Sequence, residues 1–386
     1  MEELYTLGRE VGRGSYGVVF EGHVSKTGRH VAIKRLPCGS PEAVELHLQE
    51  LWAMRTTART HPNVIALHRS LLQTGARTLR DLRPGRLPLD LVECALKGKV
   101  PGPSVQSLRR TTLRDCTNLK GTPDTPLRSP GKPGGRKRKR KRSSGDEDED
   151  GPVIPRGTPA CCRALWLVME LCDGGDLNQY LLSRPADGQM NRSVMAQLSA
   201  AVAFLHGLGI THRDLKPDNV LVQDSPTGPV FKVADFGLSK VTDGPGEAAG
   251  RCFSSACGSD FYMAPEVWAG VSYTAQVDIF SLGVLFWAVL ERITFMEEGT
   301  TRKQLGAYVC KGSYGLVPLG EALLENPDLR LVIPMKSRRL PLLPSPPGPS
   351  VSRLLHAMLA PDPLARPPAA QLETRLRSAL LRDDAR

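Results

Sequence analysis

Three side chains in residues 212–219 (HRDLKPDN) have the types and spacing that suit phosphoryl transfer. Asp214 can accept the proton of an attacking hydroxyl, Lys216 can neutralise charge on the moving phosphate, and Asn219 can ligate a metal ion. Phosphoryl transfer depends on positioning and charge neutralisation more than on covalent chemistry. A base, a cation and a metal ligand on one loop therefore suit it, and a charged surface loop is the alternative.

A glycine-rich turn near the start of the chain could hold the phosphates. Residues 6–24 are predicted to form two strands joined by this turn, in which Gly12, Gly14 and Gly17 let backbone N–H groups approach a ligand. The same glycine pattern also occurs in dinucleotide folds, but those need a helix after the turn. Here residues 18–20 continue as strand. This favours two strands joined by a turn, a hairpin that would cover a nucleotide.

The next strand, residues 30–34, ends in Lys34. Its distance from the last loop glycine is typical of a lysine that binds nucleotide phosphates. Residues 41–59 have apolar residues at helical spacing and are predicted to form a helix. Glu45 or Glu50 of this helix could pair with Lys34. We expect Glu50, which is nearer the usual spacing from the His-Pro-Asn segment that follows.

Taken together, these motifs resemble those of eukaryotic protein kinases. Residues 212–219 match the catalytic-loop pattern H-R-D-L-x-x-x-N, and residues 31–34 match V-A-I-K. Asp-Phe-Gly at 235–237 and Ala-Pro-Glu at 264–266 follow in the expected order. Lys216 resembles the serine/threonine type. The resemblance implies an α+β bilobal fold with a five-stranded antiparallel N-lobe sheet, one N-lobe helix and a mostly helical C-lobe.

The resemblance also assigns the cofactors, ATP and Mg²⁺. Lys34 and Glu50 would orient the phosphates, and Asp235 and Asn219 would hold the metal. The side chain of Met169 would be the gatekeeper, and the hinge backbone would bond adenine. The predicted ATP contacts are Val11, Gly12, Gly14, Gly17, Val19, Ala32, Lys34, Met169, Glu170, Cys172, Asp176 and Leu221.

Further ionic contacts are implied in the C-lobe. Glu266 would pair with Arg366, and Asp278 would brace the catalytic loop. The predicted activation segment, residues 235–266, contains a candidate phosphosite at Ser255, with Ser254 as the alternative and with Arg213 and Lys240 as phosphate ligands.

Substrate preference is predicted from two acids. Asp176 and Asp218 occupy places where basophilic kinases bind a substrate arginine, which gives a weak preference for basic protein substrates.

The chain's basic charge is concentrated in one segment. The formal net charge is +11, and residues 74–162 contain twenty Lys or Arg against ten Asp or Glu. Because this segment is rich in Pro, Gly, Ser and charge, we predict a largely disordered insert. The predicted N-lobe then comprises residues 1–73 and, as last strand and hinge, 163–172, and the C-lobe comprises residues 173–386.

A run of seven basic residues within the insert has three interpretations: a nuclear-import signal, a nucleic-acid contact or a solvated charged tract. We favour import through an import receptor, and hence a nuclear location with the cytoplasm as a second one. No aromatic residue interrupts the run, so base stacking is not indicated. The run is Arg136, Lys137, Arg138, Lys139, Arg140, Lys141 and Arg142.

Three further segments resemble the nuclear PDLIM-interacting, or serine/threonine kinase 35-like, group: residues 176–180, 255–266 and 319–327. That resemblance implies a nuclear serine/threonine kinase with actin-associated LIM proteins as partners. Two other functional classes stay open. One is a pseudokinase scaffold, and the other is a nucleic-acid-binding protein that acts through the basic run.

Composition excludes several other classes. The nine cysteines are scattered without a Cys-x-x-Cys pair, which argues against a disulfide framework or zinc site. The acidic start lacks the apolar core of a signal peptide. The longest apolar stretch, residues 280–290, is too short to span a bilayer, so no membrane association is expected.

Overall fold

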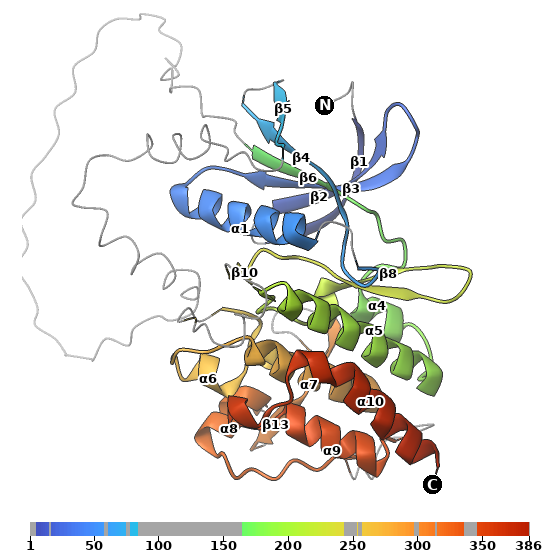
Figure 1. The fold of residues 1–386 in the computed structure, drawn as a ribbon, viewed down its shortest axis with the longest axis vertical. Coiled ribbons are helices and arrows are strands. Elements are labelled where there is room, and N and C mark those ends of the chain that lie inside the picture. Colours follow the sequence, from blue (N-terminus) through green and yellow to red (C-terminus); the bar gives the residue numbers. More distant parts are fainter. Residues whose placement is uncertain are drawn as a thin grey trace, which may run out of the picture.

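The structure is a computed structural model that describes residues 5–14, 17–57, 61–74, 78–83, 164–242, 253, 257–296, 301–312, 315–335 and 346–385. These residues form two lobes, a small one built on a β-sheet and a larger one built mainly of helices (Figure 1). The predicted α+β bilobal architecture is therefore confirmed.

Within the described residues, the N-lobe sheet has six antiparallel strands in the order β1-β2-β3-β6-β4-β5. The prediction of five strands was wrong, because residues 79–81 pair with the end of β4 and add an edge strand. That strand lies inside the segment predicted to be the insert. The strands are β1 (Tyr5–Gly14), β2 (Gly17–Val24), β3 (His30–Pro37), β4 (Leu67–Gln73), β5 (Leu79–Asp81) and β6 (Ala164–Met169).

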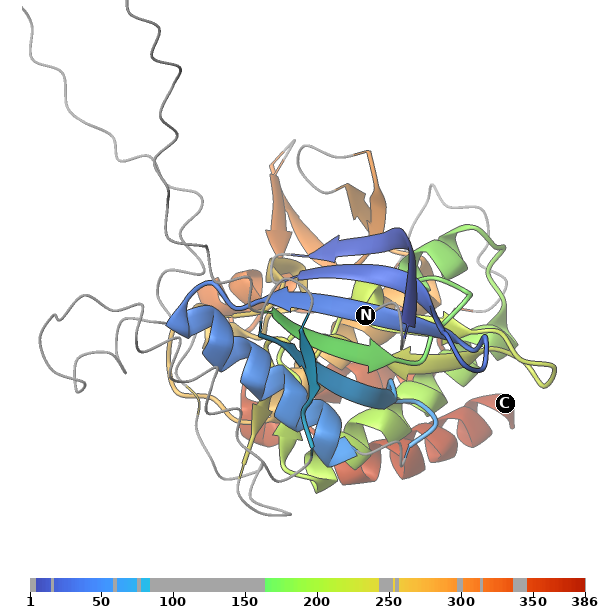
Figure 2. The ribbon, with the colours of Figure 1, turned by 90° about the horizontal axis from the view of Figure 1, so that it is seen from above.

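One helix, α1 (Pro41–Thr57), packs against this sheet. Its buried apolar residues Val44, Leu48, Leu51 and Met54 recur every three or four positions, as a one-sided helix requires. Figure 2 shows the sheet lying over the C-lobe with α1 alongside it. The glutamate that contacts Lys34 projects from the buried side of this helix.

The C-lobe core is built around α7, in which every residue from the second position onward is buried. Such a helix is enclosed on all sides by other elements. The helices of the C-lobe are α4 (Leu177–Leu182), α5 (Gly188–Gly207), α6 (Pro265–Trp268), α7 (Gln276–Glu291), α8 (Leu319–Glu325), α9 (Pro349–Met358) and α10 (Ala369–Asp384).

None of the helices in the described ranges has the length and hydrophobicity needed to cross a membrane.

Short two-stranded sheets lie in the segments between the C-lobe helices. The paired strands are β7 (Ile210–Thr211) with β10 (Lys240–Val241), β8 (Val220–Gln223) with β9 (Val230–Val233), β11 (Thr294–Met296) with β12 (Lys303–Leu305), and β13 (Tyr308–Lys311) with β14 (Gly315–Pro318).

Candidate active site

Lys34 joins the two lobes. Its Nζ lies 2.6 Å from Glu50 Oε1 on α1 and 2.9 Å from Asp235 Oδ1 in the C-lobe. The partner on α1 is thus Glu50, whereas Glu45 faces outward and accepts a hydrogen bond from Gln49. Lys34 and Glu50 expose only 11% and 2% of their side chains, so both charges depend on each other for stabilisation.

The charges around Lys34 hold it protonated. Burial alone would lower the pKa of Lys34, but the charges of Glu50 and Asp235 outweigh it and raise that pKa above its usual value. Burial would likewise raise the pKa of Asp235, yet the charge and hydrogen bond of Lys34 bring it below the ordinary range. Near neutral pH the site therefore holds a cation beside the Asp235 carboxylate.

The catalytic-loop residues meet at Asp214. Its Oδ1 accepts a hydrogen bond from Ser259 Oγ at 2.8 Å, and its Oδ2 lies 3.3 Å from Lys216 Nζ. Lys216 Nζ also donates to Ser259 Oγ at 2.6 Å. Asn219 Nδ2 donates to Asp214 Oδ2 and to the Asp214 carbonyl, both at 2.8 Å. A hydroxyl, an ammonium group and an amide thus converge on one carboxylate.

Asp278 on α7 fixes the backbone of this loop, as predicted. Its two oxygens accept the backbone N–H groups of His212 and Arg213 at 2.8 Å, and His206 Nε2 lies 2.9 Å from Oδ2. Burial would raise the pKa of Asp278, but the His206 hydrogen bond and neighbouring donors lower it. Arg213 has a positive φ of 69°, which is rare for a residue with a side chain. The bonds to Asp278 hold it there.

The glycine loop forms the β1–β2 hairpin, in which Gly14 pairs with Gly17. A Cβ on Gly17 would lie 2.5 Å from the Arg35 carbonyl, so this glycine is required for packing. No described atom lies within 4 Å of a Cβ built on Gly12 or Gly14, which leaves their backbones open to a ligand. Val11, just before them, is 45% exposed.

The other predicted adenine contacts lie on neighbouring strands. Val19 pairs with Lys34, and Ala32 pairs with Met169. In the hinge the Glu170 N–H donates to the Ala66 carbonyl at 3.0 Å, which leaves the Glu170 carbonyl for a ligand. Burial raises the pKa of the Cys172 thiol to about 12, so it is uncharged at neutral pH.

Asp176 lies opposite Leu221 in an isolated β-bridge, but its carboxylate is already engaged. One oxygen caps α4 by accepting the Gln179 N–H at 2.8 Å. The other lies 2.7 Å from Arg302, a residue that motif analysis missed. The predicted contact of Asp176 with a ribose stays a prediction.

The donor set fits a magnesium ion that is bound together with nucleotide phosphates. Mg²⁺ in such sites takes one or two oxygen ligands from the protein and the rest from phosphates and water. Asp235 supplies a carboxylate whose side chain is 47% exposed. Asn219 uses its amide nitrogen internally, so its carbonyl oxygen is the remaining ligand. No cluster of three His, Cys, Asp or Glu side chains suited to a metal occurs among the described residues.

The predicted structural ion pair between Glu266 and Arg366 is present. Two hydrogen bonds of 2.6 and 2.8 Å join the groups, and the Arg366 side chain is fully buried. Arg366 also donates to the carbonyls of Ala360, Pro361 and Gln276. This pair ties α6, at the end of the predicted activation segment, to the C-terminal part of the lobe.

Two groups of predicted residues lie outside the described part of the chain: the phosphosite candidates Ser254 and Ser255, and the basic run 136–142. The predicted phosphate ligand Lys240 is described, and burial followed by the charge of Arg213 lowers its pKa. Arg213 itself donates to the Leu238 carbonyl and to the Tyr273 hydroxyl.

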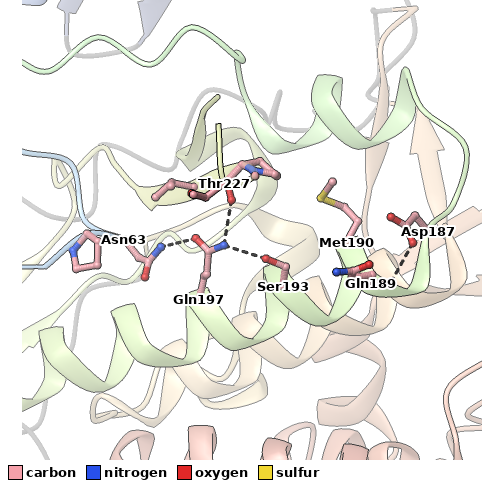
Figure 3. A pocket seen from close by; sticks show the side chains of 11 residues that line it. Asn63, Asp187, Gln189, Met190, Ser193, Gln197 and Thr227 are labelled. Atoms are coloured by element: carbon pink, nitrogen blue, oxygen red, sulfur yellow. Dashed lines mark hydrogen bonds between the residues drawn. The ribbon is translucent and has the colours of Figure 1, made fainter. Parts of the chain in front are cut away.

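A pocket separate from these residues lies between α5 and the β8–β9 turn (Figure 3). Gln197 crosses it, donating to Ser193 Oγ and the Pro229 carbonyl and accepting from Asn63 and the Phe231 N–H. Because its amide is satisfied by these contacts, Gln197 is a structural residue. None of the predicted nucleotide contacts lines this pocket.

Comparison with known proteins agrees with this geometry. The family described as "Protein kinase domain" matches residues 161–375, and "Protein tyrosine and serine/threonine kinase" matches residues 5–79. The interval between the two matches falls within the predicted insert.

Similar curated proteins include the serine/threonine-protein kinase RAD53 of Saccharomyces cerevisiae, 35% identical over 40% of this chain and 20% of that protein. A probable myosin light chain kinase of Dictyostelium discoideum is 43% identical over 33% of this chain and 35% of its own length. The human serine/threonine-protein kinase DCLK2 is 41% identical over 33% of this chain and 16% of its own length. The matched parts thus span about a third or less of these relatives. Since the first family match alone covers more than half of the chain, the chain belongs to the protein kinase domain family.

Proposed function

We propose that the protein is an ATP- and Mg²⁺-dependent protein kinase that phosphorylates serine and threonine hydroxyls of protein substrates. The observation that carries this proposal is the contact of Lys34 with both Glu50 and Asp235. In protein kinases the lysine–glutamate pair and the metal-binding aspartate must be in place together for transfer. This chain has them in place across the two lobes.

Three side chains would act directly on the transferred group. Asp214 would accept the proton of the attacking hydroxyl; a hydroxyl of the chain itself, that of Ser259, donates to its Oδ1. Lys216 would neutralise charge on the γ-phosphate, while Lys34 would hold the other phosphates. A magnesium ion held by Asp235 and Asn219 would supply charge neutralisation between the phosphates.

The choice of serine and threonine as acceptors rests on Lys216 and on the relatives. Lys216 is typical of the serine/threonine type, and it contacts Asp214 and Ser259 together. Two of the relatives named above are called serine/threonine-protein kinases.

The test is phosphate transfer from labelled Mg·ATP to a generic basic protein by the wild type and by Asp214→Asn. Because a positioned general base contributes about 10²- to 10⁴-fold, we expect the variant to lose at least about 100-fold in rate. Nucleotide binding, followed by fluorescence, should persist. Asp328→Asn, at an exposed aspartate, is the matched control.

Full activity of Asp214→Asn would refute the assignment of the base. If neither protein transfers phosphate while both bind ATP, the result favours a pseudokinase scaffold or an enzyme that awaits phosphorylation. Ser255→Glu would then distinguish these two interpretations.

We also propose that the protein enters the nucleus through residues 136–142, by way of an import receptor. The support is the unbroken basic composition of this run and the resemblance to the nuclear PDLIM-interacting kinases, which likewise suggests LIM proteins as partners. Replacing the seven residues by glutamine in a fluorescent fusion should abolish nuclear accumulation. The control replaces seven Lys or Arg elsewhere in residues 74–128. Unchanged accumulation in the glutamine variant would contradict the proposal.

A further inference from the structure

Arg302 lies between two carboxylates beside the catalytic loop. Its Nη2 is 2.7 Å from Asp176 Oδ2 and 3.0 Å from Asp218 Oδ1. Both aspartate side chains are only 19% exposed, whereas that of Arg302 is 50% exposed. Two adjacent carboxylates that are mostly buried repel each other and require a cation. Burial raises the pKa of Asp218, and Asp176 adds to that effect while Arg302 opposes it.

The hairpin that carries Arg302 is held firmly at this place. Leu305 of β12 donates its N–H to the buried Asn178 side chain at 2.7 Å, and its carbonyl accepts from the buried hydroxyl of Tyr262. On β11, Phe295 stacks on Phe261 with ring centroids 3.9 Å apart. The contacts of β12 with α4 and the segment around residue 262 therefore present Arg302 to the two acids.

The position of the acids places them near a bound substrate. Asp218 belongs to the short helix η1 (Pro217–Asn219), four residues after Asp214. Four residues of chain span at most about 14 Å. An extended peptide that presents its hydroxyl to Asp214 therefore reaches Asp218 within about four of its own residues. The acid pair and its arginine can thus face side chains that flank the acceptor hydroxyl.

We propose that Arg302 determines substrate selectivity by occupying, from within the chain, the acid pair that a basic side chain of a substrate would otherwise bind. The proposal rests on the kinase function proposed above. In the wild type, a substrate arginine must displace Arg302, so the preference for basic peptides is suppressed. Without Arg302 the acid pair loses its nearest cation, and the preference appears.

The energetics allow such displacement. Arg302 is 50% exposed, so water and salt screen its charge, and a competing cation can reach the two acids. A guanidinium on a peptide offers the same planar donors as Arg302, so the exchange replaces one pair by another. Loss of Arg302 removes the competitor without removing any group that contacts the phosphates.

The test measures binding of two fluorescent peptides that differ only in arginine or glutamine three residues before an alanine, which replaces the acceptor serine. The ratio of their dissociation constants is compared between the wild type and Arg302→Gln. We expect a ratio within about threefold for the wild type and a ratio about tenfold larger for the variant, equivalent to about 1.4 kcal/mol. Lys303→Gln removes a neighbouring hairpin charge and should leave the wild-type ratio unchanged.

A second variant tests whether the acid pair is responsible. Asp176→Asn keeps a residue that can cap α4, but it lacks the negative charge. Added to Arg302→Gln, it should cancel most of the new preference. An unchanged ratio in Arg302→Gln, or an equal change in Lys303→Gln, would overturn the proposal.

Peptide binding does not require phosphate transfer, so failure here differs from failure of the Asp214→Asn comparison. Selectivity that does not respond to Arg302, together with normal transfer, would refute this inference alone. Absent transfer by both the wild type and Ser255→Glu, with a tenfold shift in binding, would refute the kinase proposal and leave Arg302 as a selectivity residue of a peptide-binding site.

Discussion

Two clusters in the described part of the chain each hold one cation between two carboxylates, and the two cations differ in exposure. Lys34 lies between Glu50 and Asp235, and Arg302 lies between Asp176 and Asp218. The side chain of Lys34 is 11% exposed and that of Arg302 is 50% exposed. The first cluster joins the lobes, and the second joins a surface hairpin to the catalytic loop.

The comparison shows that the same set of charges serves different purposes in different surroundings. A buried pair that loses one member leaves an uncompensated charge in a poorly solvated place, so the arrangement is hard to exchange. Arg302 is half exposed, so water and salt screen the cation of the second cluster, and a competing cation can replace it more easily. We therefore expect the Lys34–Glu50 pair to persist through turnover, while Asp235 and the Arg302 cluster respond to ligands.

The largest effect should follow from Lys34→Met. The variant removes the cation proposed to bind the phosphates and leaves Glu50 without its cationic partner. Since loss of one well-placed electrostatic group costs about 10²- to 10³-fold in rate, phosphate transfer should fall at least that much. Arg302→Gln, assayed with a peptide that lacks basic residues, should stay within about threefold of wild type. Equal losses in the two variants would show that the clusters do not differ as described. Circular dichroism checks that both variants fold.

Stability should show the same contrast at two other pairs. Glu266→Gln leaves the buried Arg366 guanidinium without its counter-ion, and we expect the free energy of unfolding to fall by about 3 kcal/mol. Glu373→Gln breaks the ion pair between Glu373 and Arg377, whose side chains are 50% and 71% exposed, respectively. The free energy of unfolding should fall by about 0.5 kcal/mol or less. Urea denaturation measures both values. A cost at Glu373 equal to that at Glu266 would argue against burial as the cause.

The smallest effect concerns titration of two aspartates. Removing a nearby cation destabilises a carboxylate, so the pKa of Asp235 should rise in Lys34→Met and that of Asp218 should rise in Arg302→Gln. The first rise should be larger, because Lys34 dominates the lowering of the Asp235 pKa. Carbon-13 NMR titration of aspartate carboxyls checks the order.

The sign for stability follows from the same shift. The folded-state pKa of Asp235 is depressed. The contribution of Asp235 to the free energy of unfolding is therefore complete above its unfolded-state pKa. It is lost as the pH falls through its folded-state pKa. Lys34→Met should remove this pH-dependent contribution of Asp235 to stability.

Contiguous motifs made the segments that carry Lys34 and Asp214 predictable. Strand β3 and its lysine, and the loop that carries Asp214, are short segments whose chemistry is local. Helical period alone does not separate Glu50 from Glu45, because the two lie on opposite flanks of the apolar stripe of α1; only packing against the rest of the N-lobe buries Glu50.

Contacts between distant segments were not predictable in this way. Arg302 is 126 residues from Asp176, and nothing near Arg302 in the chain marks it as a partner of that acid. Strand β5 was missed because three residues are too few for a pattern, and its place depends on pairing with β4. Both features follow from tertiary packing rather than local preference.

Strand β4 holds both ends of the long interval between β5 and β6. Leu71 pairs with Asp81 on one side and with Trp166 on the other. With strands about 4.8 Å apart, the two flanking residues lie only about 10 Å from each other. Closing a loop between fixed ends costs only about 0.6 kcal/mol for each doubling of its length. The chain can therefore gain or lose whole sequence segments between these strands while the proposed nucleotide site stays unchanged. This position is a natural place for evolution, or an engineer, to insert new sequence.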